Sequence, residues 1–185
     1  MSIDKAKNMA LFIKKLEQVG VDTKLLQEKY GQQIENATFT PNGEFGNAYE
    51  GSFLEIILKT LTPFAVRMND LFTEDKRVDK STLVKVCLLH QIAKAVMLIP
   101  NDNEWEMSKL KKIFKYTDDK PAIKTGLMSL AMCQECGIPF TMEEVEAMTI
   151  NDADPSDTMT RFHASRMSNI VKAASSFTYS QLETK

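Results

Sequence analysis

The sequence predicts an all-α protein, and three observations support this fold class. Apolar residues recur at spacings of three and four in several long segments, which is the pattern of a helix with one buried face. The 185 residues include only seven glycines and six prolines, so few turns are expected. Valine and isoleucine nowhere alternate with polar residues over a convincing length, so no half-buried strand is indicated.

The length and composition fit one folded domain. Hydrophobic residues make up 43% of the chain and charged residues 26%, as in ordinary globular proteins. The net charge of −2 gives no overall basic field that would favour nucleic acid. The first ten residues lack an apolar signal segment, and no apolar run approaches the ~18 residues of a membrane span. Three cysteines, an odd number, favour a reducing compartment, so a cytoplasmic protein is expected.

The N-terminal part of the chain predicts two short helices and a loop. Residues 4–19 show helical spacing, and Gly20 would end the first helix. Asp22 would cap a second helix that ends at Gly31. Residues 36–47 read as a loop because they contain Pro41, Gly43 and Gly46. We expect residues 1–47 to form a helical extension and residues 48–185 the main helical domain, within one folding unit.

The stretch from Ser81 to Lys94, STLVKVCLLHQIAK, predicts a central helix that is buried on most sides. Its apolar residues share one face: Leu83, Val86, Leu89 and Ile92–Ala93. Ser81 is the candidate N-cap. His90 and Lys94 are four residues apart, so they would lie on the same side of this helix.

Further helices are predicted before and after this segment. Residues 49–69 have a helical pattern in which Pro63 would introduce a kink. Residues 125–137 predict a helix that ends at Gly137. Thr141 and Glu144 have the spacing of a capping box, and residues 170–183 predict the last helix.

Two segments resemble the metal-binding motifs of HD-domain phosphohydrolases. LVKVCLLHQIAK is similar to the family's core helix, roughly LLHDIGK, in which adjacent His and Asp residues bind the metal. Here His90 is present but is followed by Gln91. YEGSFLEI, from Tyr49, is similar to the family's YEGSLLEH, and the position of its first His ligand is Ile56.

Three weaker similarities extend the resemblance toward the C-terminus. The stretch that begins at Thr125 is similar to HGEKS, with Thr125 at the His position. Residues 146–151 are similar to EALAIRWH, and Asn151 stands at its His position. IVKAASSFTYSQLE, from residue 170, is similar to ILHAADMIASQLE, with Ser175 at the Asp position.

The resemblance implies a compact HD-like bundle that has lost most of its metal ligands. A divalent cation needs several anionic or imidazole donors, and of this set only His90 remains, so we expect neither a metal nor a cofactor. Without the metal, no bound water becomes a hydroxide near neutral pH. The leading interpretation is a catalytically inactive HD-like protein, similar to short proteins of bacteria and phages, that acts by binding in a regulatory, host-interaction or structural role.

Six residues would line what remains of the family's site. They are His90, Gln91, Lys94, Thr125, Asn151 and Ser175. Lys94 could contact a phosphate as a point charge, so a nucleotide-like ligand is one interpretation. In the other, the cavity has filled and the polar groups satisfy one another. A protein partner, or a second copy of the chain, is then expected, whereas a membrane or nucleic acid is not.

An enzyme is the alternative class: a divergent, metal-dependent phosphohydrolase of nucleotides or phosphate esters centred on His90. Two further arrangements involve cysteines. Cys87 with His90, and Cys133 with Cys136, have the spacings of a Cys3His zinc site. Cys87 and His90 could also form a nucleophile–base pair, although an apolar setting raises the pKa of a thiol.

The segment from Met107 to Tyr116 is locally basic. Four lysines alternate with apolar residues there: Lys109, Lys111, Lys112 and Lys115. This pattern predicts an exposed strip with an apolar underside, and the alternative is a patch that binds phosphate or nucleic acid. Trp105, the only tryptophan, precedes the strip and is predicted to be a core anchor.

Overall fold

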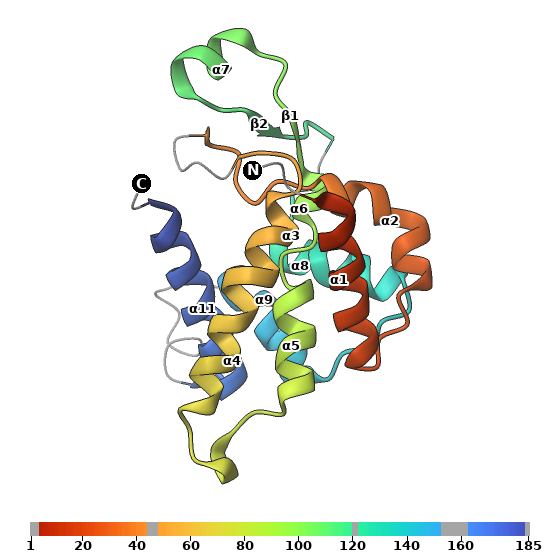
Figure 1. The fold of residues 1–185 in the computed structure, drawn as a ribbon, viewed down its shortest axis with the longest axis vertical. Coiled ribbons are helices and arrows are strands. Elements are labelled where there is room, and N and C mark those ends of the chain that lie inside the picture. The colour runs from red at the N-terminus through yellow and green to blue at the C-terminus, as the bar shows by residue number, and fades with distance from the viewer. Residues whose placement is uncertain (1–3, 44–47, 120–121, 153–162, 184–185) are drawn as a thin grey trace.

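The described residues fold mostly into helices, which confirms the all-α class (Figure 1). The computed structural model describes residues 4–43, 48–119, 122–152 and 163–183. The α-helices are α1 (Lys5–Gln18), α2 (Lys24–Asn36), α3 (Ser52–Ile56), α4 (Thr62–Asp70), α5 (Lys80–Leu89), α6 (Lys94–Met97), α7 (Glu104–Leu110), α8 (Thr125–Glu135), α9 (Met142–Thr149) and α11 (Arg166–Glu183). A π-helical segment, η2 (Ile57–Leu61), joins α3 to α4, and η3 (Glu74–Lys76) and η4 (Ile150–Asp152) are 3-10 turns.

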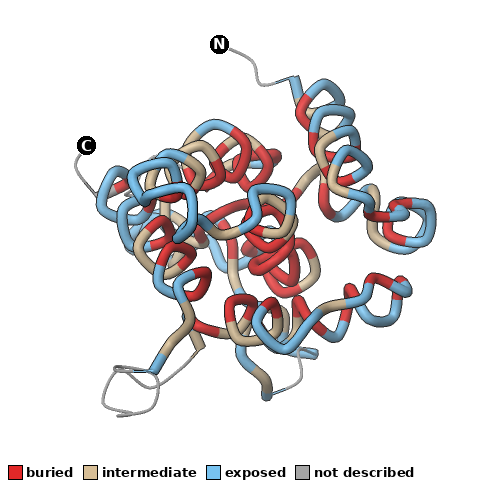
Figure 2. The backbone as a smooth tube through the Cα atoms, turned by 90° about the horizontal axis from the view of Figure 1, so that it is seen from below, coloured by how far each residue is buried: buried red, intermediate tan, exposed pale blue. Residues whose placement is uncertain are grey.

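One apolar core is shared by the N-terminal helices and the rest of the bundle. Phe12 and Leu16 of α1 and Leu26 of α2 are fully buried, and they belong to the same cluster as the core residues of α5. Figure 2 shows the buried residues of the helices turned toward the interior. Helix α5 lies against α1, α4, α9 and α11, which makes it the central element. In the described part of the chain, no helix is long and apolar enough to cross a membrane.

The first helix begins and ends where the sequence predicts, but the second does not. Asp4 caps α1 by accepting a hydrogen bond from the Lys7 N–H at 2.9 Å, and Gly20 follows the helix in the left-handed conformation, with φ of 82°. Helix α2 continues through Gly31 to Asn36, so the predicted end at Gly31 is wrong. A glycine inside a helix costs only about 1 kcal/mol, and burial of the apolar face of α2 offsets this cost.

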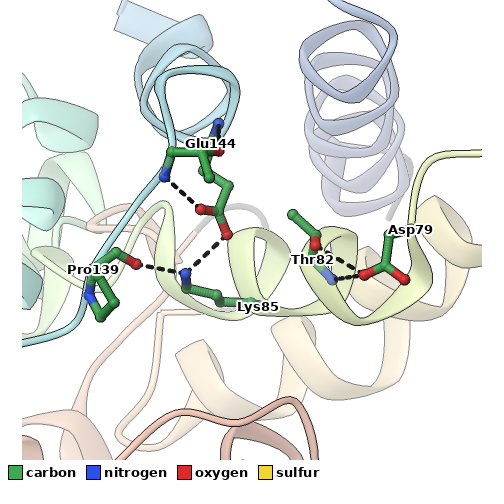
Figure 3. Close-up of polar contacts among 6 residues, drawn as sticks. Asp79, Thr82, Lys85, Pro139 and Glu144 are labelled. Atoms are coloured by element: carbon green, nitrogen blue, oxygen red, sulfur yellow. Dashed lines mark hydrogen bonds and ion pairs between the residues drawn. The ribbon is translucent and has the colours of Figure 1, made fainter.

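The predicted central helix is shorter than expected. Asp79, rather than Ser81, is the N-cap of α5, because its carboxylate accepts from the Thr82 N–H at 2.8 Å (Figure 3). The helix ends at Leu89, and residues 91–93 form a tight turn. The cause is tertiary: the Ala93 N–H donates to Ser129 Oγ at 3.0 Å instead of to the carbonyl of Leu89. His90 and Lys94 therefore do not lie on one continuous helix.

The segment before α5 contains a π-helical turn immediately before Pro63. The Thr62 N–H donates to the carbonyl of Ile57, five residues back, which defines the π-helical turn η2. Pro63 follows in the first turn of α4, where its missing N–H costs nothing. Gly51 precedes α3 with φ of 82°, and a Cβ there would lie 2.7 Å from Lys5 Cγ.

Helix α9 begins with the predicted capping box. The Thr141 N–H donates to the Glu144 carboxylate at 2.7 Å, and the Glu144 N–H donates to the Thr141 hydroxyl at 3.3 Å. Glu144 also forms an ion pair with Lys85 of α5 at 2.8 Å, and Lys85 donates to the carbonyl of Pro139 at 2.6 Å (Figure 3). The start of α9 is thereby tied to the centre of α5.

An arm, residues 98–116, projects from one end of the bundle (Figure 1). It consists of β1 (Leu98–Pro100), helix α7 and β2 (Phe114–Tyr116), and the two strands pair antiparallel. The sequence did not predict these strands. Trp105 is 60% exposed, so its prediction as a core anchor is wrong. Lys109 and Lys111 are exposed, as expected for a solvated strip. Leu110, Ile113 and Tyr116 are exposed as well and Phe114 alone of the four apolar residues is buried, so the predicted apolar underside is wrong for most of the strip.

Candidate functional site

Three of the six predicted site residues form a hydrogen-bonded chain, which runs from the buried side chains of His90 and Ser175 to the exposed Asn151. His90 follows α5, Asn151 lies in η4 and Ser175 lies on α11. His90 Nδ1 is 3.1 Å from the carbonyl oxygen of Cys87, and because a carbonyl can only accept, this nitrogen carries the proton. Nε2 therefore accepts from the Ser175 hydroxyl at 3.1 Å. The Asn151 amide donates to Ser175 Oγ at 3.0 Å, which completes the chain.

The surroundings keep His90 neutral. Burial is the main cause and lowers the pKa of His90 to about 4, and the nearby positive charge of Lys94 lowers it as well. A histidine with so low a pKa is a weak general base at neutral pH. Although Ser175 donates to this histidine, it is only 2% exposed, so a substrate would not reach the pair in this conformation.

Two other predicted residues, Gln91 and Lys94, meet a tyrosine of α11. Lys94 Nζ donates to the Tyr179 hydroxyl at 2.7 Å, and this hydroxyl lies 3.5 Å from Gln91 Oε1. The ammonium also lies 3.8 Å from the centre of the Phe39 ring, a cation–π contact. Burial lowers the pKa of Lys94 to about 7. Within the described residues Lys94 has no carboxylate partner.

Thr125 lies apart from both groups. It is half-buried at the start of α8, and its carbonyl accepts from Ser129 Oγ at 2.8 Å. The Ser129 hydroxyl in turn accepts from the N–H of Ala93. The Ser129 hydroxyl therefore links the backbone of Thr125 to the turn that follows His90. The structure brings together five of the six predicted residues and leaves Thr125 at the edge.

The sequence interpretation missed Tyr179, Phe39 and the bridging role of Ser129. Tyr179 follows Ser175 by four residues on α11, so helical spacing could have placed it on the same face. Phe39 lies in the segment after α2, where no periodic pattern indicates which residues face the core.

The resemblance implies a divalent metal ion, and the donors at the corresponding positions do not fit one. Ile56 is an aliphatic side chain without a donor atom, and both ring nitrogens of His90 are used in hydrogen bonds. Gln91, Asn151 and Ser175 offer only neutral groups. Among the described residues, no group of three or more His, Cys, Asp or Glu side chains could bind a metal ion.

The two arrangements that involve cysteines are also not formed. Cys87, Cys133 and Cys136 are buried free thiols, and they do not gather with His90 into a zinc-binding group. His90 contacts the backbone carbonyl of Cys87 rather than its sulfur. Burial raises the pKa of the Cys87 thiol to about 12, so it is not a thiolate at neutral pH. Both the zinc site and the nucleophile–base pair are therefore wrong.

Comparison of the chain with protein-family models, with curated proteins and with solved structures finds no match.

Proposed function

We propose that the protein is a catalytically inactive, HD-like protein that acts by binding another protein. The observation that carries this proposal is that the buried side chains of His90, Ser175 and Lys94 all have hydrogen-bond partners within the chain. His90, Asn151 and Ser175, at three of the family's ligand positions, form a neutral chain instead of a donor set for a metal. The proposal places the protein in the cytoplasm of a bacterial cell, including a cell infected by a phage.

The same contacts favour a protein partner over a nucleotide-like ligand. Lys94, the residue predicted to contact a phosphate, already donates to Tyr179 and lies against Phe39. An incoming phosphate would have to displace the contacts of Lys94 with Tyr179 and Phe39. It would also have to lose its hydration shell, because Lys94 is buried. Binding through the outer surface requires no such rearrangement, which supports a regulatory, host-interaction or structural role.

Metal analysis combined with a phosphatase screen tests the proposal. The purified protein is assayed with nucleotides and phosphate esters in the presence of manganese, cobalt or nickel, beside a His90→Ala variant. We expect no retained metal and no turnover that differs between the two proteins. Activity that disappears in His90→Ala would instead establish the alternative, a divergent phosphohydrolase centred on His90.

A thermal-shift series separates the two kinds of partner. A nucleotide that binds near Lys94 would raise the melting temperature by mass action, and Lys94→Met would abolish the shift. We expect no shift with nucleoside mono-, di- or triphosphates up to millimolar concentration. A Lys94-dependent shift would show that the interior site binds a phosphorylated ligand and would count against the protein-partner proposal.

A further inference from the structure

Polar contacts within the arm fix the position of α7 relative to the segments on either side of it. Asn103 caps α7 by accepting from the N–H groups of Trp105 and Glu106, both at 3.1 Å. The Asn101 amide donates to the Glu106 carboxylate at 3.0 Å and to the carbonyl of Lys112 at 2.8 Å. These bonds define the path of the chain at the arm. Buried Phe114, whose N–H donates to the carbonyl of Pro41 at 3.2 Å, attaches the arm to the segment that precedes α3.

Most of the apolar side chains of the arm face water. Helix α7 has no buried residue, Trp105 is 60% exposed and Leu110 is 39% exposed. Ile113, which follows α7, is 45% exposed. A rigid element that presents a tryptophan and two aliphatic side chains has the features of a binding anchor, because little conformational entropy is lost when it docks.

The arm also carries positive charge that no described carboxylate neutralises. Lys112 pairs with Glu106 at 3.6 Å and Lys115 with Asp102 at 2.6 Å. Lys109 and Lys111 form no ion pair with any described carboxylate, and both are exposed. The only acidic residue of α7 outside these pairs is Glu104, at the opposite end of the helix from Lys109. The end of α7 that leads to β2 is therefore apolar and cationic.

A groove between α1 and α2 has the complementary character. Its floor is apolar, and its lining residues are Ala6, Met9, Ala10, Ile13, Lys14, Glu17, Gln27 and Glu35. It is an open hollow of about 440 Å³, and a second open hollow of about 450 Å³ shares Glu17 and Gln27 with it and adds the charged residues Asp22, Lys24 and Glu28. The two hollows together carry four acidic and two basic side chains, so their net charge is −2.

We propose that the arm docks into the α1–α2 groove of a second copy of this chain, with Trp105 over the apolar floor and Lys109 beside Glu17. The inference rests on the proposed binding role and names its partner. Opposite charges at the rim would orient the encounter, and burial of the apolar side chains would supply the affinity. Since arm and groove are different surfaces, each copy can give one contact and receive another, which produces a closed ring or an open chain.

Trp105 is the only tryptophan, so its fluorescence reports directly on the arm. Emission and iodide quenching are measured over a dilution series, with sedimentation velocity on the same samples. We expect the emission to shift to the blue and quenching to decrease as assemblies form with rising concentration. A monomer whose Trp105 stays quenchable at every concentration would overturn the inference, while the phosphatase result, and with it the proposed function, would be unaffected.

Matched variants identify the groove. Ala10 lies on the exposed face of α1 within the groove, and Ala131 is an exposed alanine of α8 outside it. Ala10→Arg should abolish both assembly and the Trp105 shift, whereas Ala131→Arg should change neither. Circular dichroism confirms that each variant is folded. Assembly that survives Ala10→Arg would overturn the assignment of the groove.

A charge exchange tests the pairing itself without altering the apolar contact. Lys109→Glu alone and Glu17→Lys alone should each weaken self-association by about tenfold, because like charges then meet at the rim. An equimolar mixture of the two variants should assemble as the unchanged protein does. If mixing restores nothing, or if Trp105 is protected by a single-stranded oligonucleotide while the chain stays monomeric, the second copy is the wrong partner.

Discussion

Ser175 is the residue that joins three elements inside the bundle. It donates to His90 after α5 and accepts from Asn151 in η4, while its own backbone belongs to α11. Ser175→Ala leaves the His90 ring nitrogen and the Asn151 amide without this partner. Loss of a buried hydrogen-bond partner costs about 1–3 kcal/mol. We therefore expect the free energy of unfolding, measured in urea, to fall by that amount.

A serine at the surface provides the control for that measurement. Ser81 is exposed in the first turn of α5, so Ser81→Ala should change stability by less than about 0.5 kcal/mol. If Ser175→Ala and Ser81→Ala changed the free energy of unfolding equally, water would be replacing the Ser175 hydroxyl as hydrogen-bond partner with no loss of stability. The site would then be open rather than filled, in conflict with the proposed function.

The pH dependence of stability should show that His90 is buried and neutral. Its pKa is about 4 in the folded protein and near 6.5 when unfolded, so the unfolded chain binds more protons between these values. The contribution of neutral His90 to the free energy of unfolding is complete above pH 6.5. This contribution, about 3 kcal/mol, is lost as the pH falls toward 4. Because carboxylates titrate in the same range, the measurement compares urea unfolding of the protein with that of His90→Gln, whose profile should be flatter by this amount. Parallel profiles would show that His90 titrates normally.

The residues of the site differ in how far the sequence could predict them. His90, Asn151 and Ser175 belong to segments with a recognisable pattern, and they do meet. The pattern gave no sign of Phe39, because contacts made by an irregular segment depend on the positions of helices distant in sequence. Lys94, for which a phosphate contact is predicted, lies against Tyr179 and Phe39 of its own chain, because a buried polar group needs partners.

At the scale of elements, some helix ends encoded by neighbouring residues were predictable, although the predicted cap of α5 at Ser81 and the predicted end of α2 at Gly31 are wrong. Asp4 and Gly20 bound α1, and Thr141 with Glu144 opens α9, because each of these signals acts within one turn. Ends that depend on distant contacts were not. The end of α5 at Leu89 requires a hydrogen bond from Ala93 to Ser129, which no local pattern reveals.

The arm shows a second limit of sequence patterns. Strands of three residues are too short for alternation to be detected, and β1 ends at a proline. Trp105 was predicted to be buried because large apolar side chains usually are. Its 60% exposure on α7 is the observation on which the interaction proposed for the arm depends.

The ion pair between Lys85 and Glu144 should be the most sensitive link between α5 and α9. Their side chains are 13% and 6% exposed, and Lys85 also donates to the carbonyl of Pro139. Lys85→Met would leave the carboxylate buried without its partner, at a cost of about 3–5 kcal/mol. We expect urea unfolding to show this loss, and Glu144→Gln in the same chain to recover part of it, because glutamine can still complete the capping box.

A surface pair with similar geometry is the control. Lys59 and Glu55 are 2.6 Å apart on η2 and α3, and the Lys59 side chain is 63% exposed. Lys59→Met should cost less than about 1 kcal/mol, because solvent screens exposed pairs. If both substitutions had the same small effect, Lys85 and Glu144 would be reached by water, and α9 would be attached to α5 by apolar contacts alone.

In the whole molecule, residues 1–47 and residues 48–185 share one core, although the sequence patterns predict a boundary between them. The predicted boundary at residue 48 follows a change from short helices and a loop to the segments that resemble HD proteins. Across this boundary the apolar core is continuous, since α1 and α2 supply fully buried residues to the cluster around α5. The same two helices form the groove proposed for the arm. The N-terminal helices therefore contribute to the interior with one face and to the proposed assembly with another.

Phe12 tests whether this shared core makes the molecule one cooperative unit. It is fully buried on α1, whereas Leu11 beside it is exposed. Phe12→Ala should lower the free energy of unfolding by about 3–5 kcal/mol, and Leu11→Ala by much less. If the unit is cooperative, hydrogen exchange in α11 should accelerate with the same free-energy change, because opening of α1 and of the bundle is then a single event. Acceleration confined to α1 and α2 would instead mean that the N-terminal helices unfold on their own, and that the boundary at residue 48 separates two independent units.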